Sequence, residues 1–170
     1  LSSKTELTVG LNANNTTYSL KDKFNLTAEN KSGDYNFDLK LSPSIAITQH
    51  LSSNNILFGN ISHGFSNPTL EEILLPSNEI NTSIKPEEGW NFEIGNRGKL
   101  LNNKVHYSIA LFQMNVKNLL VAKRINEDQY VGVNAGKTNY KGVELSVNYS
   151  IAKNNSIHIT QSHNSSINNY

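Results

Sequence analysis

Strict alternation of apolar and polar residues over 142–151 constrains the fold of this chain more than any other feature. Every second residue is apolar, namely Val143, Leu145, Val147, Tyr149 and Ile151, and the residues between them are glycine or polar. Side chains that alternate in this way point to opposite faces of a β-strand. The alternation resumes at Ile157, so the segment predicts a hairpin with one apolar face. That face must pack against a protein core or against lipid.

The same two-residue period occurs in five further segments and predicts an all-β fold. These segments cover 4–18, 37–50, 55–65, 89–100 and 104–117, and the hairpin within 141–160 adds two more strands. The segment 55–65 carries apolar residues at both parities, so its two faces are less distinct than those of the others. No long helix is expected. The sequence therefore predicts about seven antiparallel strands.

The connections between the predicted strands are alternately short and long. The short ones contain Asn-Asn and fall at 52–55, 102–103 and 153–156, and the long ones cover 19–36, 66–88 and 118–138. Asparagine tolerates the left-handed backbone conformation of tight hairpin turns. Outer-membrane barrels have short turns at the periplasmic end and long loops at the extracellular end. The alternation therefore favours lipid as the environment of the apolar face.

Composition agrees with a membrane barrel and excludes several other classes. Only 36% of the 170 residues are hydrophobic, and the mean hydropathy is −0.47. This suits a barrel, in which half of each strand faces a polar lumen. The net charge of +1 gives no indication of nucleic-acid binding, and the absence of cysteine excludes a disulfide framework. Because the smallest common barrels have about eight strands, we expect the chain to be part of a larger barrel.

Three motifs follow one another on the predicted strands and the long connections. They are Gly64-Phe65-x-x-Pro68 with Glu71 or Glu72, then Lys85-Pro86-Glu87 with Glu93 and Gly95, and then Asn134-Ala135-Gly136 with Gly142-Val143-Glu144. Together they resemble the later barrel strands of TonB-dependent outer-membrane receptors of the ferric-siderophore type. The resemblance covers about residues 37–152. It departs from the family at His63, where an arginine often precedes the Gly-Phe pair.

The resemblance implies a transport role for a longer protein. Residues 1–170 would form part of one receptor barrel of about 22 strands, with the plug domain and the TonB box outside them. The receptor would lie in the outer membrane of a Gram-negative bacterium, in contact with its lipid. It would take up an iron chelate with energy from the TonB-ExbB-ExbD complex, acting through the plug. The alternatives are a receptor of the same fold for haem, cobalamin or a glycan, and a surface β-rich adhesion or binding module without a transport role.

Four residues near the first motif are the candidate ligand-binding residues: His63, Phe65, Glu71 and Glu72. They fall where a predicted strand leads into a long connection. Imidazole and carboxylate groups are possible iron ligands, but their spacing here matches no metal signature. We therefore expect recognition of a whole chelate, without a protein metal site or cofactor. No catalytic arrangement is found, and an enzyme is not expected.

Charged and aromatic residues on the strands have expected structural roles. Glu93, Arg97 and Glu144 lie on the polar parity of their strands, so they are predicted to face the lumen and to form ion pairs that hold the wall strands in register, with contact to a plug or ligand as the alternative. A charge on the lipid face near the midplane would cost about 2–4 kcal/mol. Four aromatic residues are predicted to anchor the sheet at the membrane interfaces, with ligand stacking as the alternative: Trp90, Tyr107, Phe112 and Tyr149.

Overall fold

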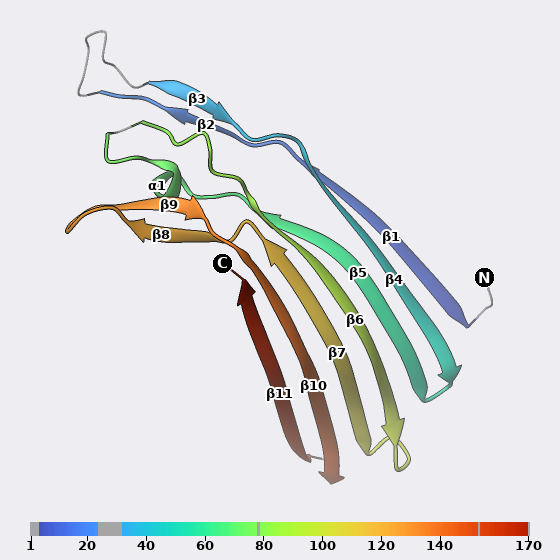
Figure 1. The fold of residues 1–170 in the computed structure, drawn as a ribbon. Coiled ribbons are helices and arrows are strands. Elements are labelled where there is room, and N and C mark those ends of the chain that lie inside the picture. Colours follow the sequence, from blue (N-terminus) through green and yellow to red (C-terminus); the bar gives the residue numbers. More distant parts are fainter. Residues whose placement is uncertain (1–3, 24–31, 78, 153, 170) are drawn as a thin grey trace.

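One curved antiparallel sheet of seven strands dominates the computed structural model, which describes residues 4–23, 32–77, 79–152 and 154–169 (Figure 1). The strands are β1 (Thr5–Asn14), β4 (Lys40–Ser52), β5 (Asn55–Ser66), β6 (Glu87–Leu100), β7 (Val105–Lys117), β10 (Lys137–Ala152) and β11 (Asn155–Asn169). Each pairs with the next in the order β1-β4-β5-β6-β7-β10-β11. The seven predicted antiparallel strands are thereby confirmed.

The three long connections contain smaller elements that the alternation did not predict. The first holds the hairpin of β2 (Thr17–Leu20) and β3 (Gly33–Asn36), and the third holds the hairpin of β8 (Leu120–Arg124) and β9 (Tyr130–Asn134). The second holds the short helix α1 (Leu70–Ile73). All of them lie beyond the same end of the main sheet (Figure 1).

In the part of the chain that the structure describes, no helix is long and apolar enough to cross a membrane.

The short turns lie at the opposite end of the sheet from the long connections (Figure 1). Between β6 and β7, Leu101, Asn102 and Asn103 have φ values of 51°, 53° and 66°. Asparagine adopts this left-handed region more readily than most residues, as the Asn-Asn pair led us to expect. Between β4 and β5 only Ser53 and Asn54 separate the two strands. The structure therefore confirms that short and long connections sort to opposite ends.

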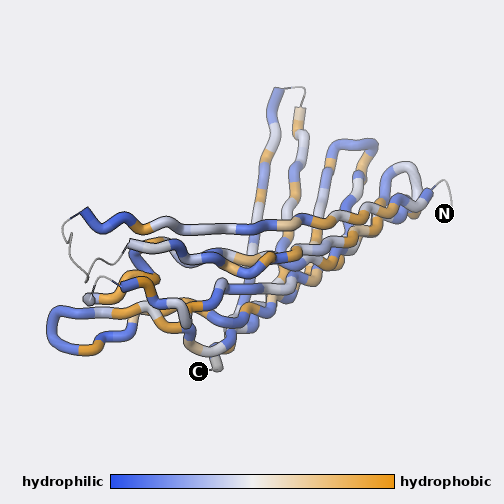
Figure 2. Tube along the Cα trace, turned by 90° about the horizontal axis from the view of Figure 1, so that it is seen from above, coloured by the Kyte–Doolittle hydropathy of each residue, from blue (hydrophilic) through white to orange (hydrophobic). Residues whose placement is uncertain are grey.

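The strand register aligns the apolar parities into one continuous face, here called the apolar face. Its directly paired residues include Leu7 with Ile47, Ile45 with Ile61, Ile94 with Leu111, and Leu111 with Val143. The opposite parity forms the polar face, with members such as Asn60, Glu93, Ser108, Glu144 and Ser146. Figure 2 shows the resulting alternation of hydrophobic and hydrophilic residues along the strands.

The apolar face is the more exposed of the two. On β6, Phe92 and Ile94 are 38% and 54% exposed, whereas Gly95 on the polar face is buried and Glu93 is half-buried. Within the described residues the buried apolar side chains other than proline are Phe37, Ile73 and Ile84, which all belong to the long connections. The main sheet therefore has no protein core against its apolar face.

Three of the four predicted interface aromatics lie where such anchors would be needed. Trp90 lies on the apolar face near the long connections, and Tyr107 and Tyr149 lie on the same face near the short turns. Phe112 does not, because it lies on the polar face in the middle of β7. A Cβ on Gly142 would approach its ring to 2.6 Å. The interface prediction is therefore wrong for Phe112, whose ring covers a glycine on the neighbouring strand.

Candidate functional site: the loop layer

The long connections pack into a single layer at one end of the sheet. We call their described parts the loop layer, which comprises residues 15–23, 32–39, 67–77, 79–86 and 118–136. Ile73, which ends α1, is fully buried in this layer, and Phe37 and Ile84 are each only 4% exposed. Burial of these three side chains stabilises the connections against one another, because apolar surface is removed from water.

The first and second connections are joined by hydrogen bonds and aromatic contacts. The Tyr18 hydroxyl donates to the carbonyl oxygen of Pro68 at 2.8 Å. The Asn67 side-chain amide donates to Thr16 Oγ1 at 2.9 Å. Phe37 packs edge-on against Tyr18, with their ring centroids 5.6 Å apart. Pro68, which belongs to the first sequence motif, is buried. The β2–β3 hairpin contacts it through the hydrogen bond from Tyr18.

Tyr35 forms the second link between these two connections. Its hydroxyl donates to the carbonyl oxygen of Ile84 at 2.9 Å, and its ring lies 4.7 Å from that of Phe37. Burial, with a smaller contribution from the Asp38 carboxylate, raises the pKa of Tyr35 above its ordinary value. A raised pKa keeps the hydroxyl protonated, so it remains a hydrogen-bond donor at neutral pH.

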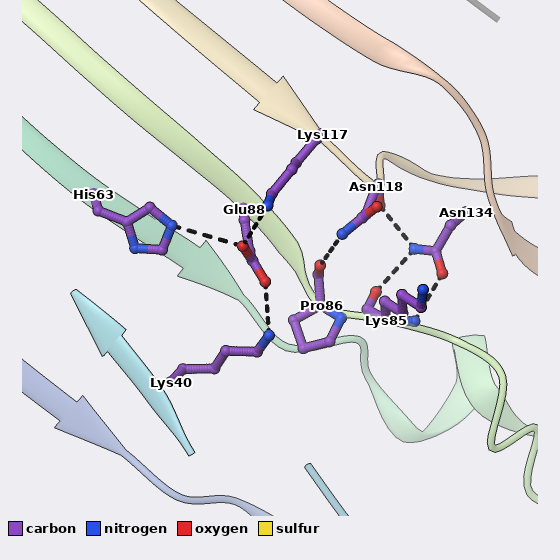
Figure 3. Close-up of polar contacts among 8 residues, drawn as sticks. All are labelled: Lys40, His63, Lys85, Pro86, Glu88, Lys117, Asn118 and Asn134. Atoms are coloured by element: carbon purple, nitrogen blue, oxygen red, sulfur yellow. Dashed lines mark hydrogen bonds and ion pairs between the residues drawn. The ribbon is translucent and has the colours of Figure 1, made fainter. Parts of the chain in front are cut away.

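A pair of hydrogen bonds between the Asn134 side chain and the Lys85 backbone joins the second connection to the third (Figure 3). Asn134 Oδ1 accepts from the backbone nitrogen of Lys85 at 2.7 Å, and Asn134 Nδ2 donates to the carbonyl oxygen of Lys85 at 2.8 Å. The same Nδ2 donates to the carbonyl oxygen of Asn118 at 2.8 Å, and Asn118 Nδ2 donates to that of Pro86. The second and third sequence motifs therefore meet in space, which explains why an asparagine ends β9.

Two further contacts hold the β8–β9 hairpin against α1 of the second connection and against the start of β6. Glu87 Oε1 accepts a hydrogen bond from the backbone nitrogen of Leu120 at 2.7 Å. A Cβ placed on Gly132 would lie 2.3 Å from the carbonyl oxygen of Glu72, so only glycine lets β9 approach α1 this closely. The three long connections therefore form one packed unit.

A cluster of charges lies where the sheet meets the loop layer (Figure 3). Glu88 is its only carboxylate, with its side chain 14% exposed, and it binds Lys40 Nζ at 2.6 Å and Lys117 Nζ at 3.1 Å. His63 Nε2 lies 3.8 Å from Glu88 Oε2. The cluster joins β4, β5, β6 and β7. The sequence analysis missed it, although the strand register places Lys117 directly opposite Glu88.

The structure separates the four predicted ligand-binding residues into two places. His63 and Phe65 lie near the end of β5 and line a pocket of about 280 Å³. Glu71 and Glu72 lie on α1 and line another, of about 200 Å³, against the β8–β9 hairpin. Among the described residues, no group of three or more His, Cys, Asp or Glu side chains could hold a metal ion.

Structural contacts already engage two of these four residues. The His63 side chain is 10% exposed, and its ring lies 5.1 Å from that of Trp90. Glu72 forms a capping box with Thr69, whose backbone nitrogen donates to Glu72 Oε2 at 2.7 Å. Glu71 and Phe65 have no such role in the contacts described. Ligand binding by all four residues stays a prediction.

The predicted lumen-facing residues lie on the polar face. Glu93 is directly opposite Phe112, Glu144 is opposite Ala110, and the Arg97 guanidinium lies 5.5 Å from the Phe58 ring. The ion pairs found in the described part of the chain involve none of Glu93, Arg97 and Glu144. Their expected salt bridges are therefore not formed here, and their role in the wall stays a prediction.

An antiparallel sheet with an exposed apolar face, short turns at one end and a packed loop layer at the other defines a class of protein. It is a wall segment of a transmembrane β-barrel. Within this class, the chain belongs to the family described as TonB dependent receptor-like, beta-barrel, whose family model matches residues 1–169. This confirms the resemblance found in the sequence. No curated protein sequence matches the chain.

Solved structures of similar fold agree with this assignment. A copper transporter, OprC, has a TM-score of 0.75 at 17% identity, over 99% of this chain and 27% of its own. The siderophore receptor PirA from Pseudomonas aeruginosa has a TM-score of 0.73 at 15% identity, over 99% of this chain and 41% of its own. The alcaligin outer-membrane receptor FauA from Bordetella pertussis has a TM-score of 0.67 at 17% identity, over 99% of this chain and 28% of its own. The chain thus spans between about a quarter and two fifths of these proteins.

Proposed function

We propose that residues 1–170 supply part of the barrel wall and extracellular loops of an outer-membrane receptor for a ferric-siderophore-like ligand. The barrel would lie in the outer membrane of a Gram-negative bacterium, with the apolar face against lipid and the loop layer outside the cell. A plug domain elsewhere in the protein would close the lumen. The TonB-ExbB-ExbD complex would supply the energy for uptake through that plug.

The loop layer is the observation that carries this proposal. Its connections are tied together by side-chain hydrogen bonds such as Tyr18 to Pro68 and Asn134 to Lys85. A packed layer presents a defined surface to a ligand, whereas independent loops would lose conformational entropy on binding. Membership in the receptor-like barrel family supports uptake, and the siderophore receptors of similar fold support an iron chelate.

Glu71 is the residue of the loop layer that we expect to contact the ligand. It is exposed, it lines a pocket between α1 and the β8–β9 hairpin, and the helix cap uses its neighbour Glu72 instead. A carboxylate at this place suits donor groups or positive charge on the outside of a chelate. Direct ligation of iron is not proposed, since no metal-binding cluster is present in the described residues.

Growth of a deletion strain tests the proposed function. A strain that lacks the full-length gene is grown under iron limitation on single ferric chelates, and separately on haem, cobalamin, a glycan and limiting copper. We expect loss of growth on one ferric chelate, and the same loss when the TonB gene is deleted. If growth is lost only on haem, cobalamin, a glycan or limiting copper, that compound replaces the iron chelate as the proposed ligand of the receptor. Unchanged growth on every source would contradict a transport role.

Complementation tests the role of Glu71 in binding. The Glu71→Ala variant should bind the chelate more weakly on whole cells, with unchanged amounts of assembled barrel. Glu127→Ala, at the tip of the β8–β9 hairpin, is the matched control and should bind like the wild type. Equal binding by the two variants would exclude Glu71 from the site.

A further inference from the structure

The apolar face becomes polar row by row towards the loop layer on β7 and β10. The directly paired residues there are, in order, Leu111 with Val143, Gln113 with Lys141, Asn115 with Asn139, and Lys117 with Lys137. Successive rows lie about 7 Å apart, because a strand rises about 3.4 Å per residue. The outward surface therefore changes from aliphatic to cationic within a short distance.

The length of the aliphatic stretch places this change at a membrane boundary. From Val143 to Ile151, β10 covers about 27 Å, which a tilt of about 40° reduces to about 21 Å across the membrane. The apolar band of membrane barrels is about 25 Å tall. Lys141 therefore lies at the edge of the band, and Lys137 lies about 10 Å further out.

Two of the three lysines on this surface form no ion pair with the described residues. Lys117 binds Glu88, but the ion pairs among the described residues include neither Lys137 nor Lys141, and both are exposed. With Lys117 paired, the surface keeps a net positive charge beside an apolar band. Lysine is a compact point charge that binds phosphate readily.

A groove runs between these strands on the same surface. It has a volume of about 400 Å³, and its lining includes Glu88, Trp90, Asn115, Lys117, Lys137 and Asn139. Asn115 Oδ1 accepts hydrogen bonds from the Gln113 and Asn139 side chains, and among the described residues the Asn115 amide nitrogen donates to no partner. The groove therefore offers the Lys137 ammonium, the Lys117 ammonium that Glu88 already binds, and the Asn115 amide next to an indole ring.

We propose that the surface formed by Lys117, Lys137 and Lys141, with this groove, binds phosphorylated headgroups of net negative charge on lipids in the leaflet at the loop-layer end. The occupant is a lipid because the charged surface continues the apolar band, so acyl chains cover the band while the headgroup meets the lysines. The positive charge complements a phosphate. This inference rests on the proposed membrane location, but it is independent of the ligand that the receptor transports.

Lipid retention tests the inference on the full-length receptor. The purified protein is placed in micelles doped with phosphatidic acid or with phosphatidylcholine, and bound lipid is measured by native mass spectrometry. The Lys137→Gln/Lys141→Gln variant should bind phosphatidic acid about 25-fold more weakly, since each lysine beside an anionic surface contributes roughly a fivefold factor. Lys85→Gln/Lys123→Gln, in the loop layer, is the matched control and should bind like the wild type. High salt should weaken wild-type binding.

The possible outcomes separate this inference from the proposed function. Unchanged retention of phosphatidic acid in the Lys137/Lys141 variant, or an equal loss in the control, would overturn the headgroup site. Equal retention of phosphatidylcholine and phosphatidic acid by the wild type would overturn it as well. Growth on the transported chelate is measured in parallel, and the variant should keep it. A barrel that fails to assemble in the membrane in its wild-type form would contradict the proposed function itself.

Discussion

Single residues on β10 determine which side of the sheet meets which environment. Leu145 is directly opposite Ile109 on the apolar face, and Ser146 is directly opposite Ser108 on the polar face. The two neighbours have nearly the same distance from the strand ends, so they differ chiefly in the face to which they belong. This pair therefore allows a matched comparison of the two faces.

The Leu145→Arg substitution should impair assembly of the full-length barrel, whereas Ser146→Arg should be tolerated. An arginine on the lipid face near the midplane costs about 2–4 kcal/mol, and the polar lumen accommodates one. The fraction of heat-modifiable barrel in isolated outer membranes measures both effects. Equal losses for the two variants would contradict the assignment of faces.

The Gly142→Ala substitution should destabilise the barrel by about 1–3 kcal/mol, the usual cost of overpacking. A Cβ at this position would lie 2.6 Å from the Phe112 ring and 2.7 Å from the carbonyl oxygen of His163, and the latter belongs to the backbone of β11. Gly64→Ala is the control, because a Cβ there meets nothing within 4 Å. Urea unfolding of the full-length protein in detergent should show a lowered midpoint for Gly142→Ala alone.

Parity in the sequence was enough to predict the face of individual strand residues, but it could not predict their partners. Glu93 and Glu144 lie on the polar face as expected. Lys40 and Glu88 are 48 residues apart in the sequence and meet only because the ends of β4 and β6 converge at the loop layer. Contacts of this kind depend on the sheet register and the loop conformation, which local alternation does not contain.

At the scale of elements, the long connections behave as one structure because of a few side chains. Asn134 alone makes three hydrogen bonds to backbone groups of the second and third connections. An asparagine amide suits this place, since it donates and accepts at the same time. Its loss would leave several backbone groups without partners.

The Asn134→Ala substitution should loosen the junction between the second and third connections. The backbone amide of Lys85 loses its acceptor, so its hydrogen exchange in the full-length protein should become about 5- to 150-fold faster, for a local loss of about 1–3 kcal/mol. Asn126→Ala is the control, because Asn126 donates only to Gln129 at the hairpin tip among the hydrogen bonds described. Unchanged exchange at Lys85 in the Asn134 variant would show that the junction does not depend on this residue.

The two ends of the sheet should be accessible from opposite sides of the membrane. An epitope inserted after Ser77, in the loop layer, should be labelled on intact cells. An epitope inserted after Asn102, in the turn between β6 and β7, should be labelled only after permeabilisation. Labelling in the reverse pattern would refute the assignment of the long connections to the cell exterior.

The elements that sequence analysis found and missed differ in length and pattern. The main strands run for 10 to 16 residues, and most were predicted to within a few residues from their alternating polarity. The exception is β11, which extends to Asn169, nine residues beyond the predicted hairpin, through a segment without apolar alternation. The strands β2, β3, β8 and β9 have only 4 or 5 residues, too few for a period to be recognised, and α1 has 4. These short elements form through contacts within the loop layer, which become visible only in three dimensions.

At the scale of the whole molecule, the sheet is open. In the described part of the chain β1 and β11 each pair on one side only, and lipid could not satisfy the backbone groups on their free edges. The structures of similar fold belong to proteins that are about 2.5 to 4 times longer, as the covered shares of 41% and 27% indicate. A closed barrel therefore requires further strands from the full-length protein.

The central claim is that the apolar face meets lipid and the polar face meets water, and spin labelling tests it most directly. Single cysteines are introduced at each position from 143 to 148 of a cysteine-free full-length receptor in vesicles, and a nitroxide is attached to each. Collisions with oxygen, which concentrates in lipid, should be frequent at 143, 145 and 147. Collisions with a water-soluble nickel chelate should be frequent at 144, 146 and 148. Frequent collisions with the nickel chelate at both odd and even positions would contradict the account. Collision frequencies that do not alternate from one residue to the next would contradict it as well.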